Sequence, residues 1–193
     1  MRIMLKEASK SLCLVAAVAL AHDSFGAQQS PASVMVSDGK RLTVSDGRVV
    51  VAAPGDKRIL KLPPSLQRAL RTSAEIVFPE ALSRRMGGRD FILVVLKSPS
   101  SNSPGSYCGA GTEDELYVLD IDGRTAKIGL SAKVSSCLDN IELEDNGVDS
   151  PYSSIRWVGS PAGVSVSWAR DRKGVKRTGL YKMANGRFVE SGN

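Results

Sequence analysis

The residue that most often acts as a base in enzymes occurs only once in this chain of 193 residues. The single histidine is His22, which lies inside or at the edge of an N-terminal segment that we expect to be removed on export. Ser-His-Asp and Cys-His pairs need an imidazole as their base, and catalytic zinc sites usually contain at least one histidine. We therefore expect none of these centres in the processed domain, and we predict no metal and no cofactor.

The three cysteines predict one disulfide. Cys13 lies near the start of the apolar N-terminal stretch, whereas a lipid-anchored cysteine follows such a stretch, so we expect Cys13 to leave with the signal and no membrane anchor to form. Cys108 and Cys137 remain, and an even count in an exported chain implies a bridge. A closed loop of about 30 residues would stabilise the fold by roughly 3–4 kcal/mol. The bridge would also exclude either sulfur as a nucleophile.

Paired carboxylates are the remaining route to acid–base catalysis. The candidates are Glu113, Asp114 and Glu115, with Asp120 and Asp122 a few residues further on. A general acid of this kind needs a raised pKa, which burial supplies. Acidic residues beside a turn are more often a solvated rim, so the pattern leaves both interpretations open.

Charge is unevenly placed along the second half of the chain. Residues 113–149 carry ten acidic residues against three basic ones, and residues 170–187 carry seven basic residues against one acidic residue. The candidate binding residues are Arg170, Arg172, Lys173, Lys176 and Arg177. Faces of opposite charge steer a charged partner; alternatively, they keep the domain in solution or attract each other.

The two tryptophans have two possible roles. Trp157 and Trp168 could act as platforms for a sugar ring. Both lie in phase with aliphatic residues of alternating segments, and this spacing favours packing in the core.

Residues 1–27 have the pattern of a cleavable signal peptide. A basic start precedes a ten-residue apolar stretch, Leu12–Ala21, and a membrane-spanning helix needs roughly 20 residues. The candidate cleavage positions follow Ala21, Gly26 and Ala27. The alternative is a buried N-terminal helix.

Cleavage after residue 27 leaves one domain, residues 28–193. It carries 23 Lys and Arg residues against 18 Asp and Glu residues, because the removed segment holds three basic and two acidic residues. This mildly basic balance is too weak to indicate a nucleic-acid partner.

The order of apolar and turn residues predicts an α+β fold. Two Asp-Gly pairs among β-forming residues predict a three-stranded meander over 34–51. Helical spacing predicts two short inserted helices, at about 64–77 and 79–86. The apolar run 91–96 predicts a central strand covered on both faces, and alternation from residue 107 onward predicts further antiparallel hairpins. The expected fold is mainly antiparallel β-sheet with two short helices and one disulfide.

These observations favour binding over bond-making chemistry. We expect a periplasmic or secreted, non-catalytic binding protein whose partner is another envelope or secreted protein. An inhibitor or immunity factor for an envelope-acting enzyme is one such protein. The alternative is a carboxylate-dependent cell-envelope hydrolase that uses Glu113, Asp114 or Glu115.

Overall fold

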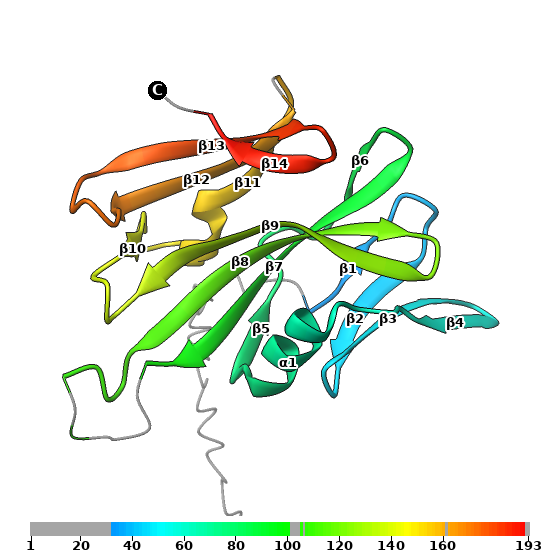
Figure 1. The fold of residues 1–193 in the computed structure, drawn as a ribbon, viewed down its shortest axis with the longest axis horizontal. Helices are drawn as coiled ribbons and strands as arrows, with labels where there is room; N and C mark the ends of the chain where they lie inside the picture. The colour runs from blue at the N-terminus through cyan, green and yellow to red at the C-terminus, as the bar shows by residue number, and fades with distance from the viewer. Residues whose placement is uncertain (1–31, 101–104, 106, 161, 192–193) are drawn as a thin grey trace, which may run out of the picture.

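A computed structural model describes residues 32–100, 105, 107–160 and 162–191. The expected signal peptide, with His22, Cys13 and all three candidate cleavage positions, lies outside these residues. The described chain is mostly antiparallel β-sheet with one disulfide. Three sheets stack in layers, with the third sheet (yellow to red) above the middle sheet (teal to yellow-green) in Figure 1.

The N-terminal sheet is a meander of four strands. They are β1 (Val34–Met35), β2 (Arg41–Ser45), β3 (Arg48–Ala53) and β4 (Asp56–Ile59). The turn between β2 and β3 uses positive φ at Asp46 (52°) and Gly47 (68°), as the hairpin prediction requires. The predicted meander had three strands; the fourth forms because the chain reverses again at Gly55, also at positive φ.

The first predicted helix is present but shorter than expected. Helix α1 spans Pro64–Thr72 and buries Leu66 and Leu70, whereas spacing alone extended it to residue 77. The chain instead enters β5 (Glu75–Val77), which pairs with β7 (Arg89–Pro99). β-branched residues favour this extended pairing, and it outweighs the helical spacing.

The second predicted helix, at 79–86, is wrong. Residues Arg84–Met86 form strand β6, which pairs with the start of β7. Gly87 and Gly88 both have positive φ, 56° and 80°. Two consecutive residues of this kind make a tight hairpin turn, so these glycines reverse a strand and do not end a helix. The only other helical segment in the described chain is the single turn η1 (Pro151–Ser154).

The middle sheet has the order β5-β7-β8-β9, with β6 also on β7. Strands β8 (Thr112–Asp122) and β9 (Thr125–Ser136) form one of the antiparallel hairpins expected after residue 107. The run Phe91–Leu96 is buried on both faces, as expected. Its alternate residues Phe91, Leu93 and Val95 enter one core, and Ile92, Val94 and Leu96 enter the other.

The third sheet covers one face of the middle sheet. Its strands are β10 (Glu142–Leu143), β11 (Ile155–Val158), β12 (Gly163–Arg170), β13 (Arg177–Ala184) and β14 (Arg187–Glu190). Phe188 from β14 meets Phe91 edge to face, with ring centroids 5.6 Å apart. The other face of the middle sheet packs on α1 and the N-terminal sheet. No helix in the described ranges is long and apolar enough to cross a bilayer.

Both tryptophans belong to the core between the middle and third sheets. Trp168 is buried, and Trp157 is partly buried with its ring 6.2 Å from that of Phe188. This packing agrees with the spacing of the sequence.

Candidate functional site

A cleft of about 410 Å³ lies between edge strand β9 and the facing side of the third sheet. Its apolar lining comes from separate parts of the chain: Ala132 from β9, Ile141 from the segment before β10, Trp168 from β12 and Tyr181 from β13. The charged lining residues are Lys133, Asp171, Arg172, Lys173, Arg177 and Glu190. Four cations and two carboxylates give the lining a net charge of +2.

The strand register of the third sheet places several side chains together on the wall of the cleft that faces β9. Arg177, Gly179 and Tyr181 alternate along β13, so they share one face. Trp168 lies opposite Arg177, and Glu190 of β14 lies opposite Tyr181. Directly paired residues point the same way, so all these side chains project toward β9.

Arg177 is held rigidly at this wall. Its Nε donates to Asp171 Oδ2 and its Nη1 donates to Glu190 Oε1, each at 2.6 Å. The guanidinium lies over the Trp168 ring, 4.8 Å from the centroid, where a cation is attracted to the aromatic face. The hydrogen bonds to Glu190 and Asp171 raise the pKa of Arg177 and outweigh the effect of burial. Within the described chain, its Nη2 makes no hydrogen bond.

Trp168 is fixed by two neighbours. Its Nε1 donates to the Val134 carbonyl of β9 at 3.0 Å, which ties the third sheet to the middle sheet. The ring lies over Gly179, where an added Cβ would approach Trp168 Cζ3 to 2.8 Å. Only glycine leaves room for the ring at this position, so Gly179 fixes where Trp168 lies.

Asp171 organises the loop between β12 and β13. Its Oδ1 accepts from the backbone N–H groups of Lys173 (2.8 Å) and Val175 (3.1 Å). Burial alone would raise the pKa of Asp171, but these two bonds and the one from Arg177 lower it below its ordinary value. The carboxylate therefore stays ionised and holds a tight loop that presents Arg172 and Lys173 at the cleft.

Tyr181 contributes a hydroxyl group to the cleft. The residue is only 8% exposed, and its hydroxyl has no hydrogen-bond partner among the described residues. Burial and then the nearby Glu190 carboxylate raise the pKa of Tyr181 to about 12, against the opposing effect of Arg177. Tyr181 lines the cleft together with both of these charged residues.

The five candidate binding residues divide into two groups. Arg172, Lys173 and Arg177 line the cleft. Arg170 and Lys176 lie outside its lining and pair with acidic residues near β10: Arg170 Nη2 is 2.7 Å from Glu142, and Lys176 Nζ is 2.6 Å from Glu144. The opposite charges of the two segments therefore attract each other at these positions, while the other three cations remain at the cleft.

Lys173 is the least engaged cation. Its ammonium forms no ion pair within the described ranges, whereas Arg172 approaches Asp139 at 3.9 Å and is 74% exposed. Lys133 binds both Asp139 (2.8 Å) and Glu113 (3.0 Å), and these bonds raise the pKa of Lys133.

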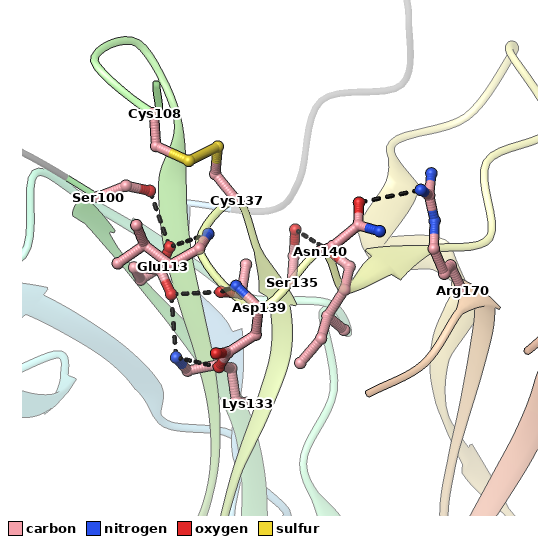
Figure 2. The surroundings of a disulfide bond; sticks show 12 residues. Ser100, Cys108, Glu113, Lys133, Ser135, Cys137, Asp139, Asn140 and Arg170 are labelled. Atoms are coloured by element: carbon pink, nitrogen blue, oxygen red, sulfur yellow. Dashed lines mark hydrogen bonds and ion pairs between the residues drawn. A yellow bond between two sulfur atoms is a disulfide. The ribbon is translucent and has the colours of Figure 1, made fainter. Parts of the chain in front are cut away.

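The predicted disulfide joins Cys108 to Cys137, with Cα atoms 5.9 Å apart. Figure 2 shows Glu113 beside it, surrounded by donors. The carboxylate accepts from Ser136 Oγ (2.5 Å), Ser100 Oγ (2.8 Å), Lys133 Nζ (3.0 Å) and the Leu138 backbone N–H (3.2 Å).

This setting makes Glu113 unsuited to proton donation. Burial works to raise the pKa of Glu113, but the bonds from Ser136, Lys133 and Ser100 outweigh it and lower the pKa to about 2. A general acid needs a pKa near the working pH. Glu113 therefore serves as the centre of a hydrogen-bonded corner that connects β8 to the disulfide.

The two acids that follow Glu113 in the sequence, Asp114 and Glu115, face opposite sides of β8. Asp114 is buried against the third sheet, where Tyr152 Oη donates to its Oδ2 at 2.6 Å. Glu115 accepts from Tyr117 Oη (3.0 Å) and from Ser131 Oγ. A cleft of about 140 Å³ is lined by all three acids and Lys133. Its other lining residues come from β7, β8 and the end of α1 and carry no carboxylate, so no second acid faces the three.

No protein-family model, curated protein or solved structure matches this chain. The case for a function therefore rests on the geometry of the chain itself.

Several residues of the 410 Å³ cleft were not among the five candidate binding residues, and Lys133, Trp168 and Tyr181 matter most for a ligand. Lys133 was counted only within an acidic segment, Trp168 was assigned to packing, and Tyr181 was seen only as part of a hairpin. Alternation along β13 does place Tyr181 on the face of Arg177. That β9 lies across the cleft from this face follows only from the packing of the sheets.

Proposed function

We propose that this protein is an exported, non-catalytic binding protein that recognises another envelope or secreted protein. An inhibitor or immunity factor that masks an envelope-acting enzyme is the form of this proposal that the small, disulfide-bonded domain fits best. The observation that supports it is the cleft between β9 and the third sheet, where Arg177 is held in place and Lys173 is unpaired within the described chain.

Fixed charges of this kind favour recognition. Arg177 is oriented before any partner arrives, so binding costs little side-chain entropy at this position. Arginine and aromatic residues are also the types enriched where protein interfaces gain most of their binding energy. The disulfide is typical of proteins outside the cytoplasm, where the partner would be met.

The hydrolase alternative has weaker support. It requires one carboxylate with a raised pKa facing a second acid. Glu113 has a lowered pKa, Asp114 is bonded to Tyr152, and no acid lies across their cleft. Burial raises the pKa of Asp120, but this carboxylate is paired with Arg89. These carboxylates are better explained as supports of the middle sheet.

Photocrosslinking in the producing organism tests the binding proposal. A photoreactive amino acid replaces Lys173 at the cleft in one full-length variant. In the control it replaces Lys57, an exposed lysine of β4 with no ion pair among the described residues. Both cultures are irradiated, and the crosslinked products are identified by mass spectrometry.

We expect a discrete adduct with one envelope or secreted protein from position 173 and none from position 57. If that partner is an enzyme, adding the purified binding protein should lower its activity in proportion to complex formation. The same products from both positions, or no adduct from position 173 in a folded and exported variant, would contradict the proposal.

A further inference from the structure

We propose that the cleft between β9 and the third sheet binds a side-chain carboxylate from an acidic segment of the partner protein. This inference rests on the proposed function and adds the chemistry of recognition. The donors assigned to the carboxylate are Arg177 Nη2 and the Tyr181 hydroxyl. Arg172 and Lys173 supply additional positive charge at the opening.

The two donors lie on one wall of the cleft. Arg177 and Tyr181 share a face of β13, and Glu190, which accepts from Arg177, is the cross-strand neighbour of Tyr181. Arg177 uses Nε and Nη1 for its own carboxylate partners, which leaves Nη2 for a ligand. The Tyr181 hydroxyl has no partner in the described chain and belongs to a residue that lines the cleft, so it is available to donate to a ligand. A carboxylate can accept from both groups, and hydrogen bonds to a charged group are the stronger kind.

The protein already contains a carboxylate bound on this face. Glu190 accepts from Arg177 Nη1 at 2.6 Å, so the guanidinium shows the geometry that a carboxylate takes here. The apolar walls provided by Ala132, Ile141 and Trp168 suit the methylene stem of a glutamate side chain. With a net charge of +2 on its lining, the cleft still attracts an anion after its two internal carboxylates are counted.

The surroundings favour an acidic peptide over a polyanion or a membrane. Carboxylates alternate with the cations at and near the opening: Asp139 approaches Arg172, and Glu142 and Glu144 pair with Arg170 and Lys176. A nucleic acid or an anionic bilayer needs a broad and uniformly basic face. Interspersed charges around a recessed, partly apolar cleft are typical of an interface between proteins.

Intrinsic fluorescence gives a local measure of binding. The chain has two tryptophans, so the Trp157→Phe variant retains only Trp168, which lines the cleft. The probe is an acetylated and amidated peptide with a single glutamate between glycine and serine residues. The matched control peptide has glutamine in its place, and neither peptide carries a terminal charge. Titrations are made at about 10 mM salt, where the Debye length is about 30 Å, and repeated at about 1 M salt.

We expect saturable binding of the glutamate peptide, weakened by salt, and no saturable signal with the glutamine peptide. Tyr181→Phe removes one hydroxyl without removing any hydrogen bond of the described protein. It should weaken glutamate-peptide binding roughly tenfold, as expected for a hydrogen bond to a charged group. Lys173→Ala should weaken it by roughly 2- to 5-fold, as expected for an exposed charge. The controls Tyr107→Phe, at a 98% exposed residue, and Lys57→Ala make the same chemical changes away from the cleft and should leave binding unchanged.

Three results would overturn the inference: equal binding of both peptides, unchanged affinity in a folded Tyr181→Phe variant, and binding to phosphatidylglycerol vesicles but not to the glutamate peptide. Crosslinking separates this failure from failure of the proposed function. If position 173 gives a specific adduct but binding does not depend on a carboxylate, the proposed function stands and the carboxylate inference fails. If the glutamate peptide binds but no adduct forms, the cleft binds a carboxylate as inferred, and the proposal of a protein partner fails.

Discussion

Removing the disulfide should cost this protein a large fraction of its stability. In the double variant Cys108→Ala, Cys137→Ala, the native fold should persist, because Glu113 still accepts from Ser100 and from the Leu138 backbone N–H across the same corner. The loss of stability then comes from the greater conformational entropy of the unfolded chain without its crosslink. A separation of 29 residues corresponds to a loop-closure entropy worth about 3.5 kcal/mol at 25 °C.

Urea unfolding of both proteins measures this cost. With an m-value of about 2 kcal/mol/M, the midpoint should fall by about 1.8 M. The m-value should also rise slightly, because an unfolded chain without the crosslink exposes more surface. A midpoint shift below about 0.5 M would refute the reasoning, as would alkylation of Cys108 or Cys137 in the unfolded wild-type chain without reductant.

Three smaller perturbations test individual contacts. Tyr152→Phe should cost about 2–3 kcal/mol in urea unfolding, because it leaves the buried Asp114 carboxylate without its donor; a loss below about 0.5 kcal/mol would contradict the pairing. Gly179→Ala should lower stability by about 1–3 kcal/mol and change the near-ultraviolet circular dichroism of Trp168, since the new Cβ would lie 2.8 Å from that ring. The Glu113 carboxyl has its pKa lowered to about 2 from 4.5, so its stabilisation is present above the unfolded pKa and is lost as the pH falls through that interval. Glu113→Gln should therefore flatten the acid side of the stability profile, and an unchanged profile would remove this role.

Alternation predicted most strands because most strands here face a core on at least one side. The run Phe91–Leu96 lacks polar alternates because sheets cover both of its faces. The tryptophans could be placed in the core for the same reason. The hydrophobic pattern of a strand follows which of its faces are buried, and in stacked sheets this burial makes the strands recognisable in the sequence.

The helices were less predictable because local signals there support two structures. Residues 74–77 have helical spacing, yet Ile76 and Val77 gain more by pairing with β7. Gly87 and Gly88 could end a helix or turn a hairpin. The choice depends on β7, a partner whose central position in the fold is not visible from the neighbouring residues.

The candidate site shows the same limit in its charges. Lys176 and Arg177 are adjacent in the sequence, but β13 begins at Arg177, whose side chain shares a face with Tyr181, whereas Lys176 belongs to the loop before the strand. Arg177 therefore reaches the cleft, while Lys176 pairs with Glu144 outside its lining. A count of basic residues treats Lys176 and Arg177 alike, but only Arg177 can meet a ligand beside Tyr181. In a basic segment that borders a sheet, the informative feature is therefore whether each cation shares a strand face with buried aromatic residues.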